Sequence, residues 1–124
     1  MEKVLVNQGY AACSTLIIDE TSIITADRGI SEKAKSLGYD ILLIPSGEIA
    51  LEGYDYGFIG GCCGFIDKNT LAFTGTLGSL TYGHIIMEYL NAKNIKVIEL
   101  TDKHMKDIGG IIPIMETRGR NKNW

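Results

Sequence analysis

Basic residues are not in excess in this 124-residue sequence. Twelve lysines and arginines face fifteen aspartates and glutamates, which gives a net charge of −3. Nucleic-acid-binding proteins normally present a basic stripe, so no nucleic-acid partner is expected. The one basic cluster, formed by Arg118, Arg120 and Lys122, lies in residues 117–124, which we expect to be a disordered tail.

Long apolar runs are also missing. None of the apolar stretches is long enough to cross a bilayer, and residues 1–7 lack the apolar core and cleavage site of a secretory leader. The sequence therefore predicts a cytoplasmic protein with no membrane partner. Residues 1–116 are expected to form a single domain, because a chain of this length is the size of one hydrophobic core.

Cysteine is scarce, with three residues at Cys13, Cys62 and Cys63. An odd number in a chain without an export signal predicts no disulfide framework, and the spacing matches no zinc site. Gly60 and Gly61 are not followed by the Lys-Ser/Thr of a phosphate loop. No metal and no cofactor are expected.

The sequence does contain an internal repeat with the order strand, strand, helix, strand. The first copy covers residues near 9–47, the second 56–101, and a third begins at 107–116. Ile18-Asp19 recurs as Ile66-Asp67, 48 positions later, and 59–61 (Ile-Gly-Gly) recurs as 108–110, 49 positions later. Two nearly equal periods indicate a repeat protein with a unit of about fifty residues.

The elements of each copy follow from hydrophobic periodicity and turn residues. Strands are predicted at 11–18, 22–25 and 41–44 in the first copy, and at 58–66, 70–73 and 95–100 in the second. The predicted helix faces are Ile30, Ala34 and Leu37, then Tyr82, Ile85, Ile86, Tyr89 and Leu90. Gly38 is the expected left-handed cap of the first helix, and Ser79 or Thr81 the cap of the second.

A ββαβ unit with Gly-Gly in its first strand resembles the blade of the pentein fold, the five-bladed β/α propeller of the guanidine-modifying enzymes. Residues 57–61 together with 107–113 are most similar to an uncharacterised, largely clostridial bacterial family of that fold. The resemblance implies an α/β, pentein-like propeller with about two whole repeats plus partial ones. A ring of five would be completed by a homo-oligomer, by a missing N-terminal region of a longer chain, or by pairing of 3–6 beside 108–115.

Catalytic penteins use a cysteine nucleophile, a histidine acid/base and carboxylates that hold a guanidinium. The resemblance implies either a Cys-dependent hydrolase or transferase acting on guanidino C–N bonds, or a degenerate relative that only binds a small molecule. The candidate catalytic residues are Cys62, Cys63, His104 and Asp107. Adjacent strand residues point to opposite faces, so at most one of the two cysteines is expected to face a site. Residues 109–114, where these enzymes carry the nucleophile, contain no cysteine.

Polar residues that follow the second strand of each repeat are the candidate substrate-binding residues: Asp27, Arg28 and Thr74. With Asp107 they would line a shallow pocket, although Asp27 also suits a helix N-cap. The structural glycines are expected to allow close packing or to mark bulges: Gly60, Gly61, Gly109 and Gly110. The alternative function is a non-catalytic protein-interaction module.

Overall fold

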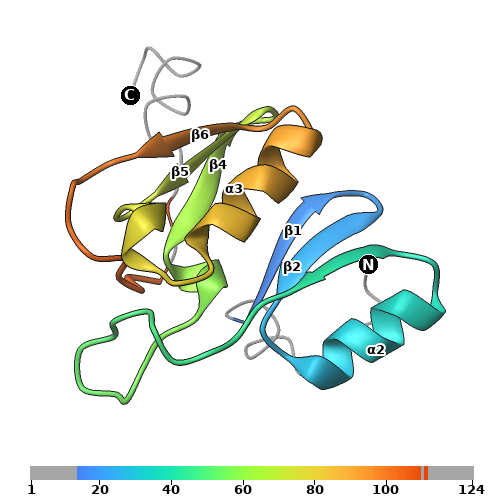
Figure 1. Cartoon of the computed structure of the whole chain (residues 1–124), viewed down its shortest axis with the longest axis horizontal. Helices are drawn as coiled ribbons and strands as arrows, with labels where there is room; N and C mark the ends of the chain where they lie inside the picture. Colours follow the sequence, from blue (N-terminus) through green and yellow to red (C-terminus); the bar gives the residue numbers. More distant parts are fainter. Residues whose placement is uncertain (1–13, 110, 112–124) are drawn as a thin grey trace, which may run out of the picture.

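The computed structural model describes residues 14–109 and 111, which form two ββαβ units (Figure 1). The elements of the first unit are β1 (Thr15–Asp19), β2 (Ser22–Thr25), α2 (Arg28–Ser36) and β3 (Asp40–Leu43). Those of the second are the 3₁₀ turn η2 (Ile59–Gly61), β4 (Cys63–Asp67), β5 (Thr70–Phe73), the 3₁₀ turn η3 (Leu77–Ser79), α3 (Gly83–Ala92) and β6 (Lys96–Glu99). The predicted α/β repeat is confirmed.

The two units share topology and register. In each three-stranded sheet the middle strand pairs antiparallel with the first strand and parallel with the third. The turns between the first two strands are also alike, because Asp19 Oδ1 accepts from the Thr21 N–H at 2.9 Å and Asp67 Oδ1 from the Asn69 N–H at 2.8 Å. These bonds lower the pKa of both carboxyl groups, which are exposed at the surface.

The helices and sheets alternate as layers, with α3 lying between the two sheets (Figure 1). Alternation along β2 decides which layer each residue faces. Ile23 packs with Ile30 and Ala34 of α2, whereas Ile24 belongs to a larger core cluster shared by both units. The first sheet is therefore covered on one face by its own helix and on the other by the helix of the next unit.

Polar contacts fix the second unit on the first at both ends of α3. Near its end, the Tyr89 hydroxyl donates to the Asp40 carbonyl at 3.1 Å, and Lys93 Nζ pairs with the Asp40 carboxylate. Just before its start, Thr81 donates its N–H and its hydroxyl to the Glu48 carboxylate, at 2.8 and 2.6 Å. The Thr81 bonds lower the pKa of Glu48.

The predicted strand 58–66 is too long at its beginning. The Gly61 N–H donates to the Phe58 carbonyl and the Cys62 N–H to that of Ile59, so the backbone makes a tight turn before β4 begins at Cys63. A turn of this kind withdraws these groups from any sheet ladder. The predicted strand 11–18 is observed from Thr15, and its residues 11–13 lie outside the described part of the chain.

Some residues assigned to buried faces are exposed. Leu37 is 49% exposed because α2 ends at Ser36, and Ile85 is 42% exposed on α3. Leu43 in the predicted strand 41–44 is 41% exposed, because β3 lies at the edge of its sheet. Gly38 has the left-handed φ of +90° that the cap prediction requires.

The predicted caps of the second helix are wrong. Its N-cap residue is Tyr82, which makes no side-chain capping bond. Thr81 uses its hydroxyl on Glu48, while the Ser79 hydroxyl donates to the Thr76 carbonyl. The Ser79 hydroxyl also accepts from the Met105 N–H at 3.0 Å, so neither side chain caps the helix start.

Residues 14–109 and 111 form two separate sheets and no closed propeller. Of the third copy only residues 107–109 and 111 are described, and just before it Ala50 and Lys106 form an isolated parallel bridge. Gly110 and residues 112–116 lie outside the described residues. Neither helix of the described chain is long and apolar enough to span a bilayer.

Candidate functional site

The two adjacent thiols are buried and share one acceptor. Cys62 is fully buried and Cys63 is 3% exposed, and their Sγ atoms donate to the Ile59 carbonyl at 3.2 and 3.3 Å. They do not point to opposite faces, because Cys62 ends the η2 turn and only Cys63 belongs to the strand. The side-chain interaction with the neighbouring Cys62 thiol and burial together raise the pKa of Cys63 well above its usual value.

Asp107 is buried and binds backbone groups. Its Oδ2 accepts from the Phe58 N–H and its Oδ1 from the Gly109 N–H, both at 3.0 Å. Two glycines make room for this carboxylate: a Cβ at Gly61 would lie 1.8 Å from Oδ1, and a Cβ at Gly57 would lie 2.4 Å from the Asp107 Cβ. The arrangement fixes the start of the third copy against η2.

His104 is exposed, and its Nε2 lies 2.7 Å from the Glu48 carbonyl oxygen. No hydrogen bond between described residues joins it to Asp107 or to a cysteine. A nucleophile and its base normally lie within hydrogen-bond reach of each other. The described residues therefore contain no assembled Cys–His pair.

Asp27 and Arg28 lie in the first unit, at the start of α2. Asp27 is the N-cap, and its Oδ1 accepts from the Ile30 N–H at 2.7 Å. Arg28 is the first residue of the helix and is exposed. In the described part of the chain neither residue contacts His104 or Asp107 through a hydrogen bond or an ion pair.

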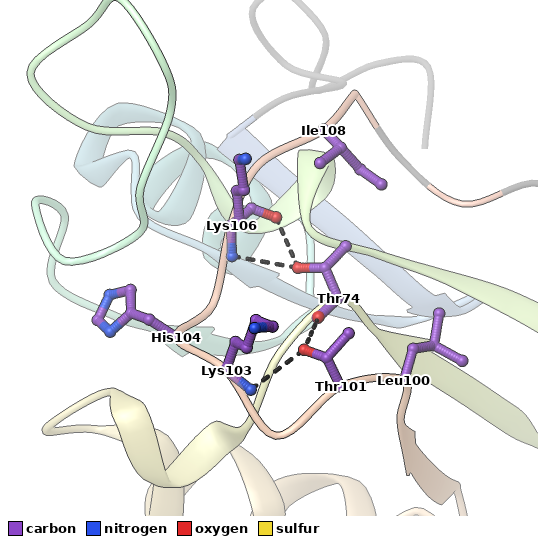
Figure 2. A pocket seen from close by; sticks show the side chains of 7 residues that line it. All are labelled: Thr74, Leu100, Thr101, Lys103, His104, Lys106 and Ile108. Atoms are coloured by element: carbon purple, nitrogen blue, oxygen red, sulfur yellow. Dashed lines mark hydrogen bonds between the residues drawn. The ribbon is translucent and has the colours of Figure 1, made fainter.

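Thr74 does lie at a pocket, at the end of β5. Its hydroxyl bonds the Lys106 carbonyl at 2.6 Å and accepts from the Lys106 N–H at 3.1 Å, while its own carbonyl accepts from the Thr101 hydroxyl at 2.7 Å. Figure 2 shows these bonds holding the segment after β6 against β5, with the His104 ring turned away from Thr74. The cavity measures about 280 Å³ and is lined by Thr74, Leu100, Thr101, Lys103, His104, Lys106 and Ile108.

The chemistry of this lining is apolar and cationic. Leu100 and Ile108 are 56% and 59% exposed, and Lys103 and Lys106 are exposed beside them. None of the described residues that line the cavity carries a carboxylate. Within residues 14–109 and 111, no three His, Cys, Asp or Glu side chains come together as a metal site.

Comparison with protein families finds a match over almost the whole chain. Residues 1–112 match a family of unknown function, DUF6873. The chain belongs to this family. No curated protein and no solved structure matches it.

In this member of DUF6873, residues at equivalent positions of the two units differ in solvent exposure. Ile44 donates its N–H to the Thr25 carbonyl and Leu100 donates to that of Phe73, each at 2.9 Å, so Ile44 and Leu100 hold the same position after the third strand. Ile44 is only 4% exposed, whereas Leu100 is 56% exposed. The difference arises because α3 and its neighbours cover the first sheet.

On the outer face of the second sheet this contrast covers part of the surface only, because Ala72 is fully buried there. Leu16, Ile24 and Leu42 of the first sheet pack in the shared core, and their equivalents are Gly64, Ala72 and Ile98. Ile111 lies against Gly64, since a Cβ there would be 2.2 Å from the Ile111 carbonyl oxygen. No described helix lies on this face. We call it the open face, and its members are Ile98, Leu100 and Ile108 with Lys96, Lys103 and Lys106.

Sequence reasoning identified Thr74 and His104 but missed the other residues of the pocket. A signal was present, because aligning the third strands of the two copies places apolar Leu100 opposite apolar Ile44. Leu100 was predicted only as the end of strand 95–100, and nothing in its neighbours showed that the covering layer differs between the units.

Proposed function

We propose that this chain is a non-catalytic interaction module of pentein-like ββαβ units, whose open face receives a partner. The exposure of Leu100 and Ile108 carries the proposal. Their counterparts Ile44 and Ile59 are 4% and 1% exposed, in the core between the units. Contiguous exposed apolar side chains with a charged rim are typical of interaction sites.

The pentein-like arrangement is supported by how the units follow each other. The helix of the second unit covers the sheet of the first, as in consecutive blades around an axis. The segments after β3 and after β6 lie side by side and parallel, joined by the bridge between Ala50 and Lys106. These two residues occupy equivalent positions in their units, which favours a rotational relation between the units.

A non-catalytic role is supported by the hydrogen bonds that the candidate thiols and the Asp107 carboxylate make within the fold. The two thiols are buried and bonded to one carbonyl, and both Asp107 oxygens bind backbone N–H groups. A nucleophile needs a thiolate and a base within reach, and a buried thiol with a raised pKa supplies neither.

Thiol labelling tests this part of the proposal. In a Cys13→Ser variant, which leaves only the buried pair, we expect no reaction with a disulfide reagent at pH 7 while the protein is folded. Unfolding in guanidinium chloride is the control and should release both free thiols. Rapid labelling of one thiol in the native state would contradict the non-catalytic assignment.

Isolation of tagged protein from its own cells tests the interaction. We expect a bound protein that is retained by the wild-type chain and lost with Leu100→Glu or Ile108→Glu. Leu37→Glu is the matched control, because Leu37 is 49% exposed and lies at the far end of the first unit. A partner that survives both open-face substitutions would overturn the assignment of this surface.

Small-molecule binding is the second candidate, and the cavity of about 280 Å³ favours it. Its volume is at the lower limit for ligand pockets. A guanidino ligand, as the pentein resemblance implies, would meet lysines and no carboxylate among the described lining residues. A rise in the melting temperature with guanidino compounds, abolished by Thr74→Val, would support this candidate.

A further inference from the structure

The contacts of α3 and of the segment before it with the first sheet indicate how a partner helix would contact the open face of the second sheet. α3 meets the first sheet through apolar side chains and through two acidic acceptors, Asp40 at one end and Glu48 at the other. Both acceptors bind donors of the second unit. A helix on the second sheet would meet the residues at the equivalent positions.

At one of those equivalent positions the charge is reversed, because Lys96 stands where the first sheet has Asp40. Asp40 pairs with Ser22 in the first sheet as Lys96 pairs with Thr70 in the second. Glu48, four residues after Ile44, corresponds to His104, four residues after Leu100. No described residue forms an ion pair with Lys96, Lys103 or Lys106.

We infer that the open face binds an amphipathic helix of a partner with acidic residues at its ends. One of these acidic residues lies near the C-terminus of the partner helix, at the position equivalent to Lys93 of α3. The inference rests on the proposed interaction function and specifies its partner. Its apolar stripe would cover Ile98 and Leu100 as α3 covers Leu42 and Ile44. Its acidic residues would pair with lysines at the rim, where complementary charge sets specificity.

A second copy of the chain does not fit this description. α3 already packs against both sheets, which leaves α2 as the described helix that packs against one sheet only. α2 carries Lys33 and Lys35 in its last turn. These lysines would face Lys96, and like charges at an interface oppose association.

Two helical peptides provide the test. Both copy residues 80–94 and are held helical by a hydrocarbon staple replacing His84 and Glu88, which are exposed and one turn apart. One peptide retains Lys93 and the other carries Lys93→Glu. Binding to the full chain is followed by fluorescence anisotropy at low salt, where surface charges are least screened.

We expect the glutamate peptide to bind wild-type protein about threefold more tightly than the lysine peptide, as one exposed charge pair allows. Lys96→Glu should reverse this preference, and Leu100→Glu should weaken both peptides. Leu37→Glu should change neither. The same preference in wild type and Lys96→Glu, or no binding of either peptide, would overturn the inference.

Sedimentation of the purified chain tests whether a second copy of the chain covers the open face. Self-association that Leu100→Glu abolishes would show that a second copy covers the open face, and would reject the acidic helix while leaving an interaction module. Loss of the cellular partner with Leu100→Glu, combined with failure of both peptides, would likewise reject only the helix. A cellular partner indifferent to Leu100→Glu would reject the proposed function itself.

Discussion

Replacing Gly61 with alanine is expected to destabilise the protein by about 3–4 kcal/mol, which is a large effect for one methyl group. The added Cβ would lie 1.8 Å from Asp107 Oδ1 and 2.3 Å from its Cγ. The carboxylate would have to leave the two N–H groups that it now accepts from. Chemical denaturation followed by circular dichroism measures the loss.

A double-mutant cycle identifies the cause of this loss. In an Asp107→Ala background the clashing atoms are gone, so Gly61→Ala should cost less than about 1 kcal/mol there. Gly83→Ala is the matched control, because its Cβ would lie 1.7 Å from the Leu77 carbonyl oxygen, far from Asp107 in the chain. Its cost should be the same in both backgrounds. Additivity of Gly61→Ala and Asp107→Ala would contradict the proposed contact.

Replacing Asp107 with alanine is expected to cost about 2–4 kcal/mol, because hydrogen bonds to a buried charged group are worth more than neutral ones. The change removes the acceptors of the Phe58 and Gly109 N–H groups. Asp107→Asn should cost about half as much, since one amide oxygen can replace only one of the two carboxylate acceptors. Denaturation midpoints of the three proteins give the order.

The same substitutions separate a structural Asp107 from a catalytic one. A structural role predicts that stability falls in the order wild type, Asn, Ala, and that amide exchange rises at Phe58 and Gly109. Unchanged stability in Asp107→Ala would show that the carboxylate does not hold the third copy against η2. It would then be available for another role.

Local pattern was sufficient to predict the repeat and most of its elements. Ile18-Asp19 and Ile66-Asp67 predicted the same strand end and turn, and both carboxylates make the same bond to the backbone two residues on. Asp27 caps α2 by the same kind of short-range bond. Such features depend on residues close in sequence, so the turns and caps of one copy can be predicted from that copy alone.

The candidate site was predicted less well, because its members depend on distant contacts. Cys62 and Cys63 were placed on one strand, but the η2 turn, closed by a bond from the Gly61 N–H to Phe58, aligns both thiols on one carbonyl. Asp107 was assigned to a pocket from its loop position, and its burial depends on Gly57 and Gly61, about fifty residues away. No local pattern records such a partner.

The sequence by itself determined that two ββαβ units exist and where most of their strands and helices lie. Only the tertiary structure decided which equivalent residues became core and which became surface. Ile44 and Leu100 are both apolar and follow the same strand, yet α3 and its neighbours cover the first and no described helix covers the second. The exposure of such a side chain depends on whether another element packs over its sheet, and the sequence of its own strand does not determine this.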